Sequence, residues 1–331
     1  MMIPIKRVWL AAFAGLVTLS VAGFATATSE SSYPHKKPVR IVVPFGPGST
    51  PDVLTRELAI RLDKKLGQTF VVENLAGASG ISGTQTVTRA APDGYTILAG
   101  TIGILAVNQF LYDNISYDVT KDLIPITLFT RNPNVLVVPA SLPVDTVEDL
   151  IKLGKTRKDP LNYGSSGNGT SLHLAAELFK QKTGMPAVHV PYSKGVMNDL
   201  LAGRIDFVFY HISGALPLAQ AGKLKILAVG TEKRWPILNQ YPTFSEAGVG
   251  DFEAGGWIAL MAPTGVPGDV VKTLSVAIND ILTNDQVLRE KFNAQGIEAG
   301  GGSPEELQAF IDNERNKWRQ VIKTADIQAN N

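Results

Sequence analysis

The stretch Val39–Leu66, VRIVVPFGPGSTPDVLTRELAIRLDKKL, predicts a buried strand, a Gly/Pro turn and a helix. Its first five residues form a β-branched run, which is typical of an interior strand in a parallel sheet. Residues 50–52 (TPD) predict a helix start, with a hydroxyl at the N-cap, proline at the first helical position and a carboxylate in the first turn. Leucines then recur every four residues as far as Leu66, and Gly67 is a helix stop.

Such a strand–turn–helix unit directs free backbone N–H groups and the positive end of a helix dipole toward one point. A carboxylate, phosphate or sulfate binds favourably there. The same pattern recurs at Leu161–Gly184, LNYGSSGNGTSLHLAAELFKQKTG. The sequence therefore predicts an anion site built from two turns of the same kind.

The N-terminal residues have the layout of a secretory leader. Lys6 and Arg7 form a basic region, residues 8–17 are apolar, and residues 25–27 (ATA) have the small side chains of a cleavage site. We therefore expect residues 1–27 to be a cleaved signal peptide and the mature protein to reside in the periplasm. An uncleaved membrane anchor is the alternative, because the apolar stretch nearly reaches spanning length.

Composition narrows the classes of partner and of chemistry. The chain has no cysteine, which excludes disulfides and a lipid-anchored cysteine. Loss of the two basic leader residues leaves 29 Lys and Arg of the original 31 against 30 Asp and Glu, a net charge of −1. A near-neutral surface argues against a nucleic acid or an anionic membrane as partner. We expect a monomer.

Strand and helix signals alternate along most of the chain, as in repeated βαβ units with a mostly parallel sheet. The chain crosses between two α/β domains near residues 136 and 254. This predicts domain 1 from residues 34–135 plus 255–331 and domain 2 from residues 136–254. We also expect a short helix at residues 242–246 and two helices after residue 262, the last with a capping box at Ser303.

The first turn offers Phe45, Gly48, Ser49 and Asp52 as candidate ligand contacts. Backbone N–H groups of Gly48 and Ser49 suit a carboxylate, and Phe45 is placed to pack on the ligand. The structural alternative is that Ser49 and Asp52 only cap their helix. For Asp52 both interpretations stay open, because a carboxylate repels an acid but attracts an ammonium group.

The second turn is dense in small hydrogen-bond donors, which favours ligand contact over a plain loop. Its candidates are Ser165, Ser166, Gly167, Thr170 and Ser171. An enzyme would use Ser166 as a nucleophile, but the nucleophile elbow G-x-S-x-G has its second glycine replaced here by Asn168. A serine hydrolase is therefore disfavoured, and we expect no catalytic residue.

The four histidines, His35, His173, His189 and His211, lack the spacing of a metal site. The chain also has no P-loop and no G-x-G-x-x-G after a strand, so nucleotide binding lacks support. We therefore expect neither a metal nor a cofactor. Tyr192 and Tyr210 follow predicted strands and are candidates either for the cleft wall or for the edge of the core.

Together the motifs resemble those of the Bug (Tct-C-like) extracytoplasmic solute receptors, which serve tripartite tricarboxylate transporters. The resemblance runs in order from about Tyr33 to Ile327. It is carried by PFGPGSTPDVLTR, VENLAGASGISG, PDGYTIL, YGSSGNGTSLHLAAELF, HVPY, NDLLAGRIDFVF, LAVGTEKR, PTFSEAG and a tryptophan before AP-x-G-x-P.

The resemblance implies a two-domain type II periplasmic-binding fold that closes like a Venus flytrap on a small carboxylate ligand. Carried over by position, it indicates the residues of the two turns and adds Thr101 on the wall of the first domain. The sequence departs from the family pattern at Ser49, where a glycine is usual, and in a shortened loop after Tyr192. A third departure is Tyr210, near which an acidic residue is common.

The resulting hypothesis is a periplasmic receptor, not an enzyme, that captures a mono-, di- or tricarboxylate, aromatic acids included. It would deliver this ligand to the membrane subunits of a tripartite tricarboxylate transporter. The alternatives are a ligand sensor for a two-component system and, less favoured, a periplasmic hydrolase that uses Ser165 and Ser166.

Overall fold

The computed structural model describes residue 1 and residues 33–192, 194–325 and 327. Apart from Met1, the predicted signal peptide lies outside the described residues. From Tyr33 onward the chain forms one compact unit. No helix within the described ranges is long and apolar enough to cross a membrane.

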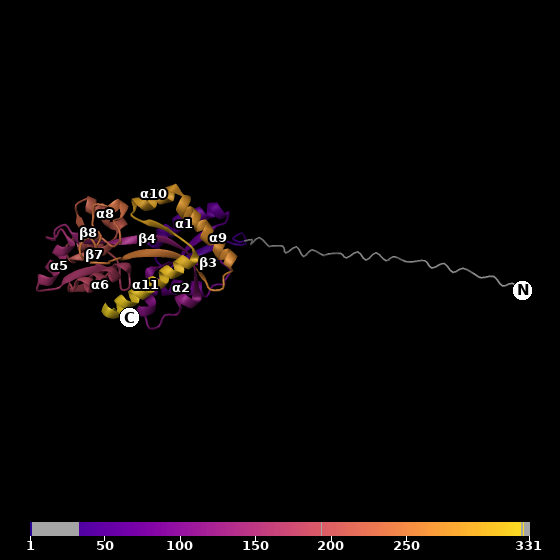
Figure 1. Cartoon of the computed structure of the whole chain (residues 1–331), viewed down its shortest axis with the longest axis horizontal. Coiled ribbons are helices and arrows are strands. Elements are labelled where there is room, and N and C mark those ends of the chain that lie inside the picture. The colour runs from indigo at the N-terminus through magenta and orange to yellow at the C-terminus, as the bar shows by residue number, and fades with distance from the viewer. Residues whose placement is uncertain (2–32, 193, 326, 328–331) are drawn as a thin grey trace. The chain divides into compact units, whose positions relative to one another are not determined.

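The core of this unit is a ten-stranded sheet with the order β2-β1-β3-β9-β4-β7-β5-β6, on which β8 and β10 also pair with β4 (Figure 1). The strands are β1 (Val39–Val43), β2 (Phe70–Asn74), β3 (Thr96–Thr101), β4 (Leu123–Pro139), β5 (Leu161–Ser165), β6 (Ala187–Pro191), β7 (Phe207–His211), β8 (Leu224–Val229), β9 (Gly255–Pro263) and β10 (Glu298–Gly301).

Parallel pairing occurs in two places: β1 lies between β2 and β3, and β5 lies between β6 and β7. The long strand β4 joins the two groups, because its first part pairs with β9 and β10 and its second part with β7 and β8. This mixed α/β arrangement is the predicted fold class. The expectation of a mostly parallel sheet was wrong, because β4 and β9 pair antiparallel with all their neighbours. The crossings expected near residues 136 and 254 fall on β4 and at the start of β9, while the exact domain boundaries stay a prediction.

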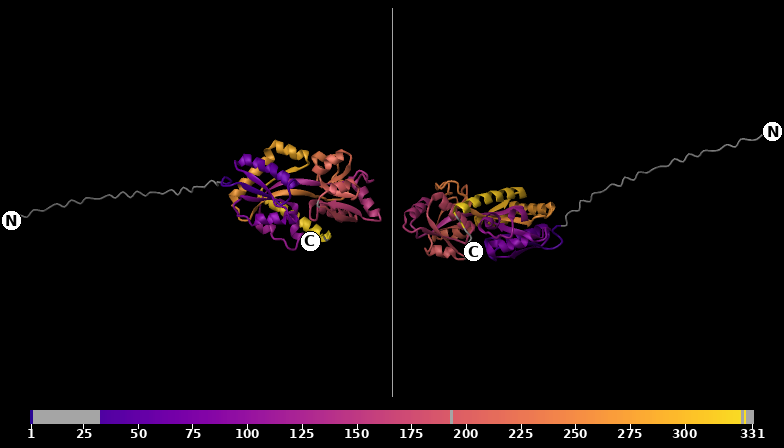
Figure 2. Two further views of the ribbon diagram at one scale, coloured as in Figure 1. Left: turned by 180° about the vertical axis from the view of Figure 1, so that it is seen from behind. Right: turned by 90° about the horizontal axis from the view of Figure 1, so that it is seen from below.

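Helices cover both faces of the sheet (Figures 1 and 2). Beside β1 and β3, helices α1, α9 and α10 pack on one face, and α2 and α11 pack on the other. The helices are α1 (Thr50–Leu66), α2 (Ile81–Thr88), α3 (Asn108–Leu111), α4 (Val119–Asp122), α5 (Val147–Thr156), α6 (Ser171–Thr183), α7 (Val196–Leu201), α8 (Ile212–Gln220), α9 (Gly268–Asn284), α10 (Gln286–Ala294) and α11 (Pro304–Ala325). Three short segments are η1 (Ala78–Gly80), the π-helix η2 (Gly103–Val107) and η3 (Pro236–Leu238).

The decisive stretch folds as predicted, with one correction at the helix start. Strand β1, helix α1 and the left-handed stop at Gly67 (φ +62°) are all confirmed. The N-cap residue, however, is Ser49 and not Thr50, and its side chain makes no capping hydrogen bond. The Asp52 carboxylate in the first turn instead accepts from the N–H of Gly48, which precedes the helix, at 2.8 Å.

Two other expectations were wrong. Residues 242–246 form hydrogen-bonded turns without a helix, because Gly248 and Gly250 follow in the left-handed conformation (φ +80° and +78°). Three helices, not two, follow residue 262. Asp285 adopts an extended conformation that separates α9 from α10, and its side chain caps α10 by accepting from Leu288 N.

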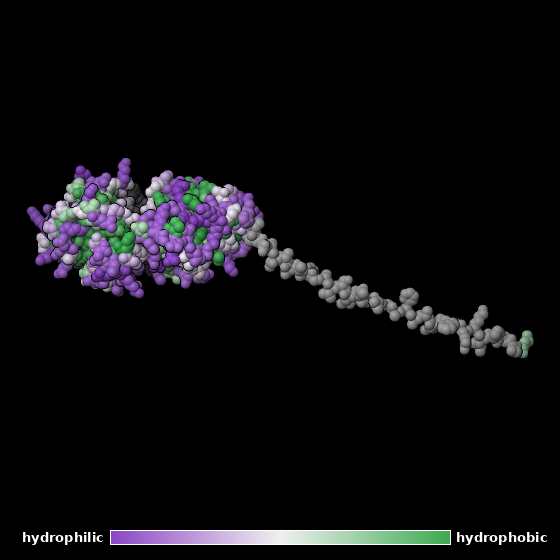
Figure 3. Space-filling view, turned by 90° about the horizontal axis from the view of Figure 1, so that it is seen from above, coloured by the Kyte–Doolittle hydropathy of each residue, from purple (hydrophilic) through white to green (hydrophobic). Residues whose placement is uncertain are grey.

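Side chains on the outside are mostly hydrophilic, as one face of the molecule illustrates (Figure 3). The large exposed hydrophobic residues after position 33 come from several separate elements: Val53, Ile60, Val71, Val188, Val276 and Val287. Such scattered exposure is normal for a protein surface. It gives no basis for assigning a docking surface.

The last helix, α11, begins at Ser303 with the predicted capping box. It is fixed to β9 by one carboxylate. Glu314, which is 9% exposed, accepts from Trp257 Nε1 at 2.8 Å and from Trp318 Nε1 at 2.9 Å. Lys317 Nζ completes the set at 2.8 Å from the other oxygen. One side chain therefore satisfies two buried indole donors.

We expect Glu314→Ala to lower the free energy of unfolding by roughly 2–4 kcal/mol, because it leaves both indole N–H groups unpaired. Chemical denaturation followed by tryptophan fluorescence measures this change. Asp312→Ala, on the exposed side of the same helix, is the matched control. Equal stabilities of the two variants would contradict the role given to Glu314.

Candidate functional site

A cavity of about 510 Å³ lies where the β1–α1 and β5–α6 turns approach β4, β7 and β9. Its lining combines uncharged polar residues with apolar ones. It consists of Phe45, Thr50, Pro51, Ser79, Thr101, Ile102, Gly103, Asn108, Tyr112, Asn132, Ser166, Gly167, Asn168, Gly169, Thr170, Ser171, Leu172, Pro191, His211, Gly256, Trp257 and Ile258. These residues are the candidate site.

The structure brings half of the predicted contact residues to this cavity. Those that line it are Phe45, Thr101, Ser166, Gly167, Thr170 and Ser171. The other six lie outside its lining: Gly48, Ser49, Asp52, Ser165, Tyr192 and Tyr210. Several of these have partners within the protein, and a ligand contact for them stays a prediction.

The first turn already holds an anion of its own, the carboxylate of Asp52. Asp52 is 3% exposed and accepts from Gly48 N at 2.8 Å, Asn74 Nδ2 at 2.9 Å and Arg56 Nε at 2.9 Å. Burial alone raises the pKa of Asp52, but these hydrogen bonds and the Arg56 charge outweigh it and hold the pKa below its ordinary value. Pro51 moreover has no N–H to offer. The positive end of α1 is thus already partly neutralised.

The second turn has no such carboxylate, so its backbone N–H donors stay available to a ligand. Helix α6 has no acidic residue in its first turn, and its N-cap is the Thr170 hydroxyl, which accepts from His173 N. The backbone N–H groups of Ser171 and Leu172 come first in the helix. Neither makes a hydrogen bond to any residue that the structure describes, and both residues line the cavity. This helix start therefore offers the stronger anion site of the two.

A stacked pair of histidines, the buried His173 and the half-buried His189, supports the second turn from behind. The rings of His173 and His189 stack with centroids 3.9 Å apart. His173 Nδ1 accepts from Gly169 N at 3.2 Å, and His189 Nε2 lies 2.7 Å from the hydroxyl of Ser165. That hydroxyl also accepts from Gly167 N at 3.1 Å, so Ser165 holds the turn in place and is fully buried.

Strand register explains why His211 and not Tyr210 faces the cavity. In the antiparallel β4–β7 pair, His211 is opposite Asn134 and Tyr210 is opposite Val135, so the two side chains lie on opposite faces. The Asn134 side chain donates to Ser171 O at 3.0 Å, which identifies the first face as the one under α6. Tyr210 packs instead with the cluster around Val135. The sequence places positions 210 and 211 at the end of this strand, but only the register determines which of the two side chains faces the cavity.

Tyr192 is also directed away from the cavity, because its hydroxyl donates to Asp199 Oδ2 at 2.8 Å. A third wall that no sequence motif indicates is formed by Ser79, Asn108 and Tyr112. Ser79 Oγ lies 2.7 Å from the Tyr112 hydroxyl, and Asn108 Nδ2 donates to Ser79 O at 3.1 Å. Ser79 has a φ of +54°, an unfavourable conformation that often marks functional sites. No sequence motif signals such a conformation at a serine.

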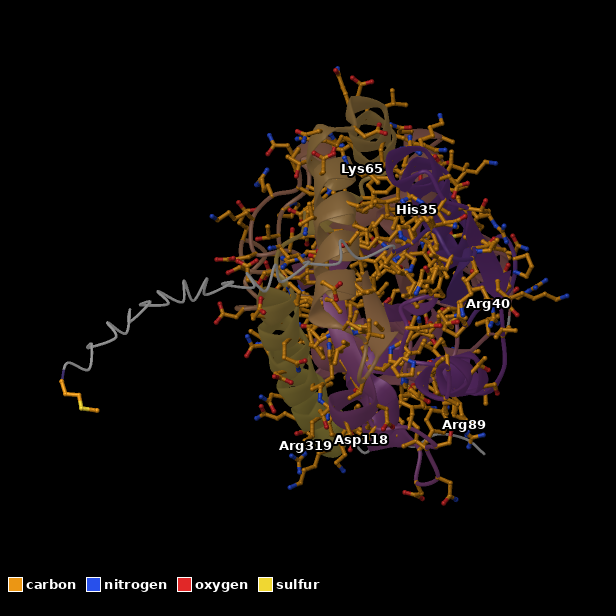
Figure 4. All side chains as sticks on the ribbon, turned by 90° about the vertical axis from the view of Figure 1, so that its right-hand side faces the viewer. His35, Arg40, Lys65, Arg89, Asp118 and Arg319 are labelled. Atoms are coloured by element: carbon orange, nitrogen blue, oxygen red, sulfur yellow. The ribbon has the colours of Figure 1, made fainter. Side chains whose placement is uncertain are left out.

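Charged side chains stay away from this cavity. None of the lining residues named above is Asp, Glu, Lys or Arg. The charged residues labelled in Figure 4 that are exposed, Arg40, Lys65, Arg89 and Arg319, lie on the outer surface. No cluster of His, Cys, Asp or Glu suited to a metal occurs in the ranges the structure covers. A charge on a ligand would therefore be met by dipoles and N–H groups.

Comparison with known families agrees with this architecture. The sequence model of the tripartite tricarboxylate transporter family receptor matches residues 54–327. The chain belongs to this family. Its members are periplasmic solute receptors, so the predicted family and fold class are confirmed.

Three similar proteins illustrate the relationship. Protein BugT of Bordetella pertussis is 34% identical over 310 residues, covering 93% of this chain and 94% of BugT. The structure of R. palustris Rpa4515 with adipate is 39% identical with a TM-score of 0.82, covering 90% of this chain and 100% of that one. MatC from Rhodopseudomonas palustris with bound malate is 27% identical with a TM-score of 0.77, covering 86% and 99%.

The geometry also bears on the hydrolase alternative. A serine–histidine contact exists, but it joins His189 to the fully buried Ser165, which does not line the cavity. Ser166 does line the cavity, yet no hydrogen bond joins it to a histidine in the described part of the chain. Receptor membership and this geometry both favour binding over catalysis.

We expect stability to fall between pH 6.5 and 4.5, because burial lowers the pKa of His173 to about 3 and of His189 to about 4. In this window the unfolded chain binds protons that the folded protein does not, so the free energy of unfolding decreases with falling pH. The slope is up to about 1.4 kcal/mol per pH unit for each histidine.

Urea denaturation at several pH values measures this slope. His189→Gln removes one of the titrating groups and makes the slope shallower. Val188→Ala, at the exposed neighbouring position, keeps the slope of the natural chain. An unchanged slope in His189→Gln would contradict the assignment.

Proposed function

We propose that this receptor captures a small organic carboxylate in the cavity and holds the carboxylate at the first turn of α6. The observation that carries the proposal is the pair of unbonded N–H groups, Ser171 and Leu172, at a helix start that lacks an acidic residue and faces the cavity. Solved relatives with adipate and with malate support a carboxylate ligand.

The energetics fit this assignment. A helix dipole contributes about 0.3–2 kcal/mol to a partly buried anion, and charge-assisted hydrogen bonds from N–H groups add to it. Phe45 and Tyr112 supply apolar surface for the rest of the ligand. Closure of the two halves around the ligand would exclude water and strengthen these hydrogen bonds.

We further propose delivery of the ligand to the membrane subunits of a tripartite tricarboxylate transporter, which the family description supports. The domain boundaries given above and a cleavable signal peptide complete the proposal. A sensor for a two-component system is the second candidate role. Deletion of the receptor gene distinguishes the two roles. A transport receptor is required for growth on the captured acid, whereas a sensor changes transcription in response to it.

A single backbone substitution tests the anion site. Ser171→Pro removes the N–H of the first helical residue, a position where proline is well tolerated. Thr170 before it is extended (φ −72°, ψ 157°), as a residue preceding proline prefers. We expect the Kd for the acid to rise by about tenfold to a hundredfold, the loss of one charge-assisted hydrogen bond.

The acid is first identified by a thermal-shift screen of C3 to C10 mono-, di- and tricarboxylates and aromatic acids. Isothermal titration then compares Ser171→Pro with Ser171→Ala, which removes the hydroxyl but keeps the N–H and should weaken binding less. The proposal fails if Ser171→Pro binds the acid as tightly as the natural protein does, or if no acid raises the melting temperature.

A further inference from the structure

Three buried polar atoms without a protein partner gather beside the first turn of α6. They are Asn132 Oδ1, Asn134 Oδ1 and His211 Nδ1. Asn132 and Asn134 are two residues apart on β4, so they share a face of the sheet, and His211 shares it because it is paired with Asn134. Such a concentration of unpaired groups on one face calls for a physical explanation.

The cavity reaches two of these three residues. Asn132 and His211 line it, whereas Asn134 lies under α6 and donates through Nδ2 to Ser171 O. Gly256 is paired with Asn132 in the β4–β9 register and lines the cavity as well. A Cβ atom at Gly256 would lie 3.2 Å from His211 Cε1 and 3.5 Å from Ser171 Oγ. The unpaired groups therefore surround the same small space as the start of α6.

The chemistry of these groups specifies what they bind. Asn132 is 7% exposed, and its Oδ1 accepts hydrogen bonds but cannot donate them. Burial lowers the pKa of His211 to about 4, so the ring is neutral at pH 7, and Nδ1 accepts in the tautomer that is protonated at Nε2. Of the groups that could pair with these two atoms, a hydroxyl donates a hydrogen bond, whereas an ionised carboxylate only accepts.

We propose that Asn132 and His211 bind the hydroxyl group of a 2-hydroxycarboxylate whose carboxylate is held at the first turn of α6. This inference rests on the proposed function of the site. The donor belongs on the carbon next to the carboxylate, because Ser171, His211 and Asn132 all adjoin Gly256. The donor is uncharged, since no Asp or Glu lines the cavity to balance an ammonium group.

Matched pairs of acids that differ by one hydroxyl group test this assignment. Isothermal titration of the purified exported protein compares L-lactate with propionate, L-malate with succinate, and mandelate with phenylacetate. We expect the hydroxy acid to bind about tenfold more tightly in each pair that binds, because its absence leaves buried acceptors unpaired.

Asn132→Leu removes the acceptor and keeps the branched shape of the side chain. It should reduce the preference for the hydroxy acid to about twofold while the affinity for the deoxy acid changes little. Asn239→Leu, at an exposed position outside the cavity, is the control and keeps both affinities. His211→Phe gives the same test on a second residue if Asn132→Leu does not fold.

The melting temperature without ligand separates this assignment from a structural water. If the acceptor is unpaired in the free protein, Asn132→Leu melts no lower than the natural chain. A marked decrease means that ordered water already satisfies Asn132, which overturns the inference. Binding of acids without a hydroxyl preference also overturns it but leaves the proposed function intact. Failure of every acid to bind contradicts the proposed function itself.

Discussion

The alternation of side chains along β4 determines which residues of the central strands face the cavity. The strand is 17 residues long and pairs with strands of both halves of the sheet, so its register fixes the faces of β7 and β9 as well. Asn132, His211 and Gly256 face the cavity for this reason. Arg131 and Trp257 are paired on the other face, where Arg131 lies over Phe310 and Trp257 donates to Glu314. A shift of one residue would exchange the two sets.

The two strand–turn–helix units are similar in sequence but differ in electrostatics. In the first, the Asp52 carboxylate lies in the first turn of its own helix and forms an ion pair with Arg56. In the second, a neutral threonine caps the helix and the neutral pair His173 and His189 supports the turn. The cavity therefore has one strong candidate anion site, at the start of α6, next to uncharged hydrogen-bond acceptors. This asymmetry favours a ligand with one buried carboxylate end and a polar but uncharged neighbour.

Much of this arrangement follows from local sequence patterns. The β-branched run, the leucine spacing and Gly67 predict β1 and α1 correctly, because the rules of strand burial and helix ends act within a few residues. The same rules placed Thr170 and Ser171 at a turn that lines the cavity. They did not place Asn132 or Gly256, whose role arises from pairing between distant strands. They also favoured Tyr210 over His211, because the face of a strand is decided by its partners.

The central claim is that the amide groups at the start of α6, more than those of α1, hold the carboxylate. Amide ¹H–¹⁵N spectra of the deuterated protein during titration with the acid found by screening test it directly. A hydrogen bond to a carboxylate moves an amide proton downfield, so the largest downfield shifts are expected at Ser171 and Leu172. Largest shifts at Thr50 and Asp52, with Ser171 and Leu172 unchanged, would contradict the account.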